Sequence, residues 1–78
     1  MERTDIYNKL KEILVKIKPS ADLTAIGDDT QLVRDLGLDS LTILLMALAV
    51  EKDFGIRFEG NPQFVTVGQV VDYVEKAL

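Results

Sequence analysis

Residues 41–50 limit the possible folds more than any other part of the sequence, because they are apolar at nearly every position. A strand of this kind would be shorter, would alternate apolar with polar residues and would contain less Ala. The stretch therefore predicts a helix that begins at Asp39 or Ser40 and ends near Phe54. Gly55 suits the position just after such a helix. A helix that is apolar on nearly every face is either buried or meets a surface beyond its own core.

Two further helices are predicted, one near each end of the chain. The first runs from about Thr4 to Lys18, where apolar residues recur at i, i+4, i+7, i+8 and i+11, and Pro19 ends it. The other opens with Thr66-Val67-Gly68-Gln69, which matches a capping box. The apolar positions that define the two helices are Ile6, Leu10, Ile13, Leu14 and Ile17, and Val67, Val70, Val71, Val74, Ala77 and Leu78.

The segment Pro19–Leu38 is predicted to be a long loop, because turn-forming residues alternate there with single apolar ones. Loops of this length in small domains are commonly functional. One helical turn is predicted near Gln31–Asp35. Another is predicted near Pro62–Phe64, at the Gly60-Asn61-Pro62 turn. The predicted fold class is all-α: a small four-helix bundle, three long helices plus one short, with a long loop between the first two helices. With 78 residues, the chain is expected to form a single domain over 1–78.

The composition excludes several kinds of site. The chain contains neither Cys nor His, which excludes disulfides, zinc sites built on those residues and a triad with an imidazole base. Residues 1–18 carry five basic and three acidic side chains, whereas residues 19–78 carry four basic and ten acidic ones. Such an acidic body repels phosphate backbones, so nucleic acid is not expected as a partner. Basic protein surfaces are its natural counterpart.

The sequence also bears on location. Its first residues are charged throughout, unlike a signal peptide. The longest apolar stretch is far shorter than the roughly 20 residues that a membrane span needs. We therefore expect a cytoplasmic protein with no membrane span. We also expect it to be a monomer.

The segment Gly37-Leu38-Asp39-Ser40-Leu41 is the candidate functional site, since it places a serine where the long loop meets the most apolar helix. One interpretation makes Asp39 or Ser40 an ordinary helix cap. The other makes Ser40 the attachment point of a phosphodiester, because a helix N-terminus offers unpaired N–H groups and partial positive charge. The two are compatible if Asp39 caps and Ser40 is exposed. Ser40 has no nearby base to activate it as a nucleophile, so the chain is not expected to be an enzyme.

Residues Thr30 to Leu41 closely resemble the attachment region of the acyl carrier proteins, a family of phosphopantetheine-binding carriers. The likeness covers nearly the whole chain, from the first helix through the loop and the Asp-Ser-Leu helix to the final helix opened by Thr66. It continues after the serine through Met46, Ala47, Leu48, Glu51, Phe54, Gly55 and Ile56.

The resemblance implies a role for each residue of the motif. A phosphopantetheinyl transferase, using coenzyme A and magnesium, would attach 4'-phosphopantetheine to Ser40, and the thiol of this arm would carry acyl groups as thioesters. Asp39 would help to position the transferase's metal or basic groups besides capping the helix. Leu41 would contact partner enzymes. Those partners would be acyl-transferring and condensing enzymes with basic or apolar docking patches, in fatty acid, lipid or polyketide-type biosynthesis.

The sequence departs from the family pattern after the serine. Carriers of fatty acid synthesis usually display carboxylates on this helix, yet the ten residues after Ser40 carry no charge. Thr42, Leu45 and Lys52 stand at positions that are commonly acidic in the family. Either Leu45 and its neighbours enlarge the core, or they form an exposed apolar docking strip. An exposed strip would favour dedicated partners and a specialised polyketide-type or lipid-modifying route.

Three alternatives remain open from the sequence. The aliphatic residues Leu44, Leu45, Met46, Leu48, Val65 and Val70 either line a space for an acyl chain or form a filled core that leaves the chain in solvent. The protein is alternatively an aminoacyl or peptidyl carrier, although Leu38-Asp39 favours the acyl kind. A helical protein-interaction module in which Ser40 is an unmodified cap is the third alternative.

Overall fold

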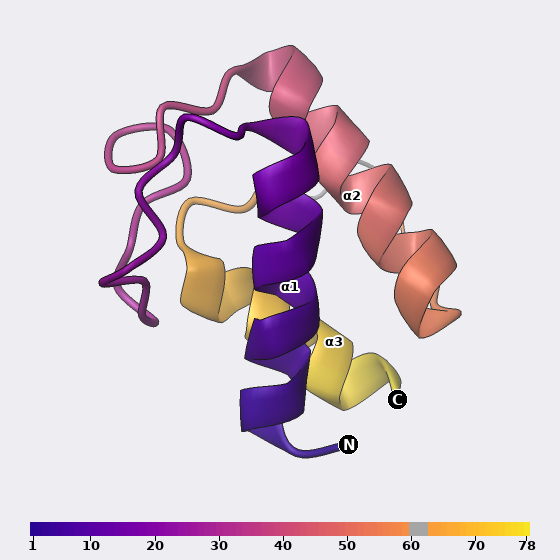
Figure 1. Cartoon of the computed structure of the whole chain (residues 1–78). Coiled ribbons are helices and arrows are strands. Elements are labelled where there is room, and N and C mark those ends of the chain that lie inside the picture. The colour runs from indigo at the N-terminus through magenta and orange to yellow at the C-terminus, as the bar shows by residue number, and fades with distance from the viewer. Residues whose placement is uncertain (60–62) are drawn as a thin grey trace.

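Three helices make up the regular structure of the chain in the computed structural model, which describes residues 1–59 and 63–78. They are α1 (Arg3–Ile17), α2 (Ser40–Phe54) and α3 (Val67–Ala77) (Figure 1). Within the described residues no strand forms, and extended pairing is confined to one isolated bridge between the loop and the residue before α3. The predictions of an all-α fold and of a long loop between the first two helices are therefore confirmed.

The short fourth helix is not confirmed. Residues 32–36 form turns rather than a helix, and Gly37, with a φ of 72°, takes the backbone into the left-handed region directly after them. The helical turn near Pro62–Phe64 begins outside the described residues, as does the Gly60-Asn61-Pro62 turn, and Gln63 and Phe64 belong to no helix. A short fourth helix stays a prediction.

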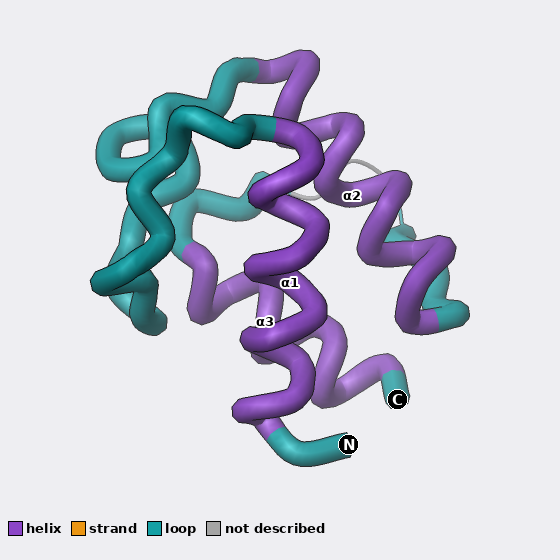
Figure 2. Tube along the Cα trace, in the orientation of Figure 1, coloured by secondary structure: helices purple, strands orange, loops and turns teal. Residues whose placement is uncertain are grey.

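The helix α1 is the centre of the packing, because it contacts both α2 and α3. In Figure 2 the long loop lies on the other side of α1 from α2. Four residues of the predicted stripe of α1 are buried and the fifth, Ile17, is partly buried. The loop contributes three buried leucines, so it is packed onto the helices. The buried core consists of Ile6, Leu10, Ile13, Leu14, Leu32, Leu36, Leu38, Met46, Val50, Phe54, Phe58, Val67, Val70, Val71 and Val74.

Backbone hydrogen bonds tie the long loop to the start of α3. The N–H of Val67 donates to the carbonyl of Thr30 at 2.9 Å, and the N–H of Gly68 donates to the carbonyl of Asp28 at 3.0 Å. These are two of the N–H groups at the beginning of α3 that no residue within the helix can pair. The loop thus supplies hydrogen-bond acceptors for two backbone N–H groups at the N-terminal end of α3. The same hydrogen bonds fix the path of the loop towards α2.

Arg3 links the same loop to two helices. Its guanidinium forms ion pairs with Asp28 of the loop and Asp72 of α3, each at 2.8 Å, and with Glu75 of α3. The hydroxyl of Tyr7 also donates to Asp28. The hydrogen bonds from Tyr7 and Arg3 lower the pKa of Asp28, while burial and the bond to Asp28 raise the pKa of Tyr7 to about 12. The arrangement holds the loop beside the first turn of α1.

Candidate attachment site at the start of α2

The helix α2 begins with a reciprocal cap made by Asp39 and Thr42. The N–H of Thr42 donates to Oδ1 of Asp39 at 2.9 Å, and the N–H of Asp39 donates to Oγ1 of Thr42 at 2.7 Å. This is a capping box, which satisfies two backbone donors at once. The sequence pointed to Asp39 or Ser40 as the cap, and the structure assigns the role to Asp39. The capping partner Thr42 was missed, although the spacing of three residues was visible in the sequence.

Ser40 is the first residue of α2 and is exposed. Because Asp39 and Thr42 make the cap, the Ser40 side chain is not needed to start the helix. Within the described part of the chain, its hydroxyl takes part in no hydrogen bond. The hydroxyl therefore lies at the positive end of a helix dipole and is accessible from solvent.

A lysine at the C-terminal cap of α1, Lys18, adds positive charge near Gly37 and Asp39, the residues that precede this serine. The Cε atom of Lys18 lies 3.8 Å from the position that a Cβ on Gly37 would occupy. The charge of Lys18 also contributes to lowering the pKa of Asp39. In the sequence analysis Lys18 appears only as the last residue of the first predicted helix. No local pattern reveals its place near Asp39, since the long loop brings the two together.

The site fits a phosphodiester on Ser40. A helix N-terminus supplies N–H donors for phosphate oxygens, and Lys18 supplies a cation near Asp39, the residue before Ser40. The carboxylate of Asp39 is turned to the backbone N–H of Thr42 by the cap. The residues present therefore suit attachment of an anionic group at Ser40.

The carboxyl group of Asp39 is expected to titrate below its ordinary range. The hydrogen bond from the backbone N–H of Thr42 contributes most to the lowered pKa, followed by the Thr42 hydroxyl. The ionised carboxylate therefore contributes its full share of the free energy of unfolding above the unfolded-state pKa of about 3.9. This contribution is lost as the pH falls through the lower pKa that Asp39 has in the folded protein. Thr42→Val removes only the hydroxyl, so the Asp39 pKa should rise but stay below the ordinary value. Carboxyl-carbon NMR titration of both proteins measures this, and an unchanged midpoint in Thr42→Val would contradict it.

Four leucines of α2 are exposed and follow one face of the helix. Leu41 is 64% exposed, and Leu44, Leu45 and Leu48 are 53%, 45% and 53% exposed. The opposite face packs against the rest of the protein through three buried residues, namely Met46, Val50 and Phe54. The interpretation that this part of the helix enlarges the core is therefore wrong for Leu44, Leu45 and Leu48, whereas Met46 does belong to the core.

The residues considered for an internal acyl-chain space do not all lie in the interior. Four of them are exposed, namely Leu44, Leu45, Leu48 and Val65, whereas Met46 and Val70 are buried. The exposed four line no interior space in this structure.

None of the helices in the described residues is of sufficient length and apolarity to span a membrane.

The chain is similar in sequence to several known proteins. A family model described as a phosphopantetheine attachment site matches residues 8–74. An acyl carrier protein of Coprothermobacter proteolyticus is 42% identical, over 100% of this chain and 96% of its own length. An acyl carrier protein of Thermotoga maritima is 32% identical, over 97% of this chain and 95% of its own length. An acyl carrier protein of Clostridium perfringens is 41% identical, over 88% of this chain and 92% of its own length.

Proposed function

This chain belongs to the acyl carrier protein family, and from that premise we propose that residues 1–78 form one carrier domain in which Ser40 bears the phosphopantetheine arm. The family carries covalently attached 4'-phosphopantetheine, and its members are carriers, not catalysts. The observation that best supports Ser40 is its place as an exposed first residue of a helix whose cap is made by other side chains.

Each residue of the site has one role in the proposal. The oxygen of Ser40 forms the ester, and the N-terminal N–H groups of α2 together with Lys18 balance the charge of the phosphate. Asp39 holds the start of the helix and presents a carboxylate to the transferase. Leu41, the residue after the serine, contacts the enzymes that bind the carrier near Ser40. When bound, the arm supplies a terminal thiol that holds acyl groups as thioesters.

The partners follow from the family. Acyl carrier proteins interact with a phosphopantetheinyl transferase and with enzymes that handle acyl groups. We place this carrier in the cytoplasm as a monomer that meets such enzymes one at a time. The acidic body, with ten carboxylates against four cations in residues 19–78, supports encounter with basic protein surfaces.

Loading with coenzyme A tests the carrier function. The purified chain is incubated with coenzyme A, magnesium and a broad-specificity phosphopantetheinyl transferase, and its intact mass is measured. A gain of one phosphopantetheine arm is expected, and an unmodified protein-interaction module would gain nothing. Supplying the loaded chain with an acyl ligase and an aminoacyl ligase in parallel separates an acyl carrier from an aminoacyl or peptidyl carrier. Acylation by the acyl ligase alone is the expected result.

We also propose a specialised pathway, of polyketide-type or lipid-modifying chemistry, over bulk fatty acid synthesis. The support is the absence of charge from residues 41–50, where fatty acid carriers usually display carboxylates. A reconstituted housekeeping system for fatty acid elongation is therefore expected to extend acyl groups on this carrier poorly. A fatty-acid-synthesis carrier assayed alongside provides the control. Elongation as efficient as on that control would contradict the proposal.

A further inference from the structure

A single arginine holds three carboxylates together where the long loop meets α3. The Nη1 atom of Arg3 contacts Asp72 and Glu75 of α3, and its Nη2 atom contacts Asp28 of the loop. Among the residues that the structure describes, every ion pair involves Arg3. We call this cluster of Arg3, Asp28, Asp72 and Glu75 the ionic latch. The two nitrogens of one planar guanidinium thus join the loop to α3, a geometry that the compact ammonium of a lysine does not offer.

The ionic latch carries an excess of negative charge. One positive and three negative side chains give it a net charge of −2. Asp72 and Glu75 lie three residues apart on α3, and like charges at this spacing on a helix repel each other. Lys11 lines the same hollow as Arg3 and Asp28 but forms no ion pair in the described part of the chain. Arg3 is therefore the counter-ion on which this convergence of carboxylates depends.

The ionic latch lies next to the hydrogen bonds that dock the loop on α3. The carbonyl of Asp28 accepts from the N–H of Gly68, and the carbonyl of Thr30 accepts from the N–H of Val67. Asp28 thus joins α3 twice, through its carbonyl to the start of the helix and through Arg3 to carboxylates further along it. When Arg3 releases the carboxylates, these two backbone hydrogen bonds lose the ion pairs that support them.

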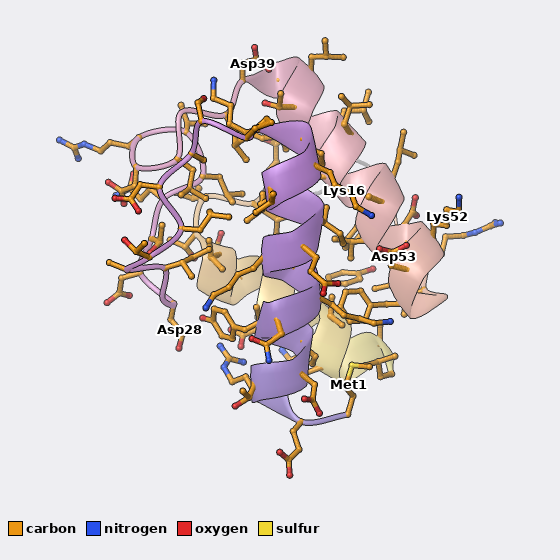
Figure 3. The ribbon with its side chains drawn as sticks, in the orientation of Figure 1. Met1, Lys16, Asp28, Asp39, Lys52 and Asp53 are labelled. Carbon is orange, nitrogen blue, oxygen red and sulfur yellow. The ribbon has the colours of Figure 1, made fainter. Side chains whose placement is uncertain are left out.

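The start of α2 is held by different contacts. Asp39 and Thr42 cap the helix, and three buried apolar side chains hold its inner face. In Figure 3, Asp28 lies beside the N-terminal half of α1, well away from Asp39 at the start of α2. A change at the ionic latch can therefore leave the beginning of α2 as it is.

We propose that the ionic latch is a salt-sensitive device in the fold, which lets the loop separate from α3 while α1 and α2 stay packed. Salt screens the attraction between exposed charges, because the Debye length falls from ~30 Å at 0.01 M to ~3 Å at 1 M. Exposed ion pairs contribute little one by one, but charges that share one guanidinium act as a network. Segments docked by exposed contacts open at lower free energy than the core does. The latch works in this way whether or not Ser40 is modified.

Hydrogen exchange of backbone amides in the full chain tests the ionic latch. The amides of Val67 and Gly68 report on the docked loop, while those of Leu14 and Met46 report on the buried faces of α1 and α2. At low salt, Arg3→Gln should speed exchange at Val67 and Gly68 by roughly three- to tenfold, because three ion pairs are lost and repulsion among the carboxylates remains. Exchange at Leu14 and Met46 should stay close to that of the wild type.

Arg34→Gln is the matched control. It removes the same charge from an exposed arginine of the loop that forms no ion pair within the described residues. Raising the salt concentration from about 0.01 M to 1 M should shrink the difference between Arg3→Gln and this control, because the charges of the latch are then screened. Equal exchange in the two variants at low salt, or a difference that is the same at every salt concentration, would overturn the inference.

A second substitution tests whether Arg3 and Asp28 act together. Asp28→Asn keeps the backbone carbonyl and removes the charge, so it should also speed exchange at Gly68. In the Arg3→Gln background it should no longer do so, because the cation is gone and only repulsion is removed. Additive acceleration by the two substitutions would overturn the inference. An equal rise in exchange at Leu14 would also overturn it, since the chain would then unfold as a whole. Circular dichroism confirms that the variants keep their helices.

Discussion

Replacing Ser40 by Ala is expected to abolish phosphopantetheine loading completely, whereas Ser20→Ala should leave loading intact. The sequence has two serines, and both are exposed, so they form a matched pair. Ser20 lies in the loop after α1, while Ser40 lies at the N-terminal end of α2. Transfer needs a hydroxyl oxygen as the acceptor, and Ala has none. Intact mass after incubation with coenzyme A, magnesium and the transferase gives the result directly.

Loss of loading in Ser40→Ala should not come from unfolding. The cap of α2 consists of Asp39 and Thr42, and neither is changed. Circular dichroism should therefore show the helix content of the wild type. A full mass gain in Ser40→Ala, or its disappearance in Ser20→Ala, would show that Ser40 is not the attachment residue.

Gly68→Ala is expected to lower the free energy of unfolding by about 2 kcal/mol, within the usual cost of overpacking. A Cβ on Gly68 would lie 2.8 Å from the carbonyl oxygen of Asp28 and 3.0 Å from its Cα. These are mainly backbone atoms, so the loop must move, and the hydrogen bond from Gly68 to Asp28 is strained. A chain of this size has a total stability of only about 4 to 12 kcal/mol. Chemical denaturation followed by circular dichroism measures the loss.

Gly27→Ala is the matched control for that substitution. Gly27 lies in the same loop, next to Asp28, and a Cβ there would meet nothing within 4 Å. Its φ is not in the left-handed region, so Ala is tolerated. We expect stability equal to or slightly above that of the wild type. If Gly68→Ala proved as stable as Gly27→Ala, the close packing of the loop on α3 would not hold in solution.

The helices were predictable because their signals are local. The stripe of α1 repeats with the period of a helix, and its observed bounds, Arg3–Ile17, differ by one residue at each end from the prediction. The capping box at Thr66 likewise marked the start of α3, where Thr66 accepts from the N–H of Gln69. The path of the long loop was not predictable. Its hydrogen bonds join residues far apart in sequence, such as Thr30 and Val67.

The candidate site also contains some features that the sequence reveals and others that only the fold determines. Asp39 and Ser40 are neighbours at a helix start, so the sequence alone singled them out. The sequence left undecided whether Leu45 is buried, because on a helix that is apolar all round the neighbouring elements decide which face is covered. Lys18 was missed as a neighbour of Asp39 for a related reason, since a loop of twenty residues separates the two positions.

The cap formed by Asp39 and Thr42 has a consequence for engineering. The cap and the proposed attachment residue are different side chains, so position 40 is open to chemical redesign. A cysteine or a non-natural amino acid with a bioorthogonal group, installed there, should leave the beginning of α2 where it is. Synthetic arms of many lengths then become accessible on one unchanged scaffold.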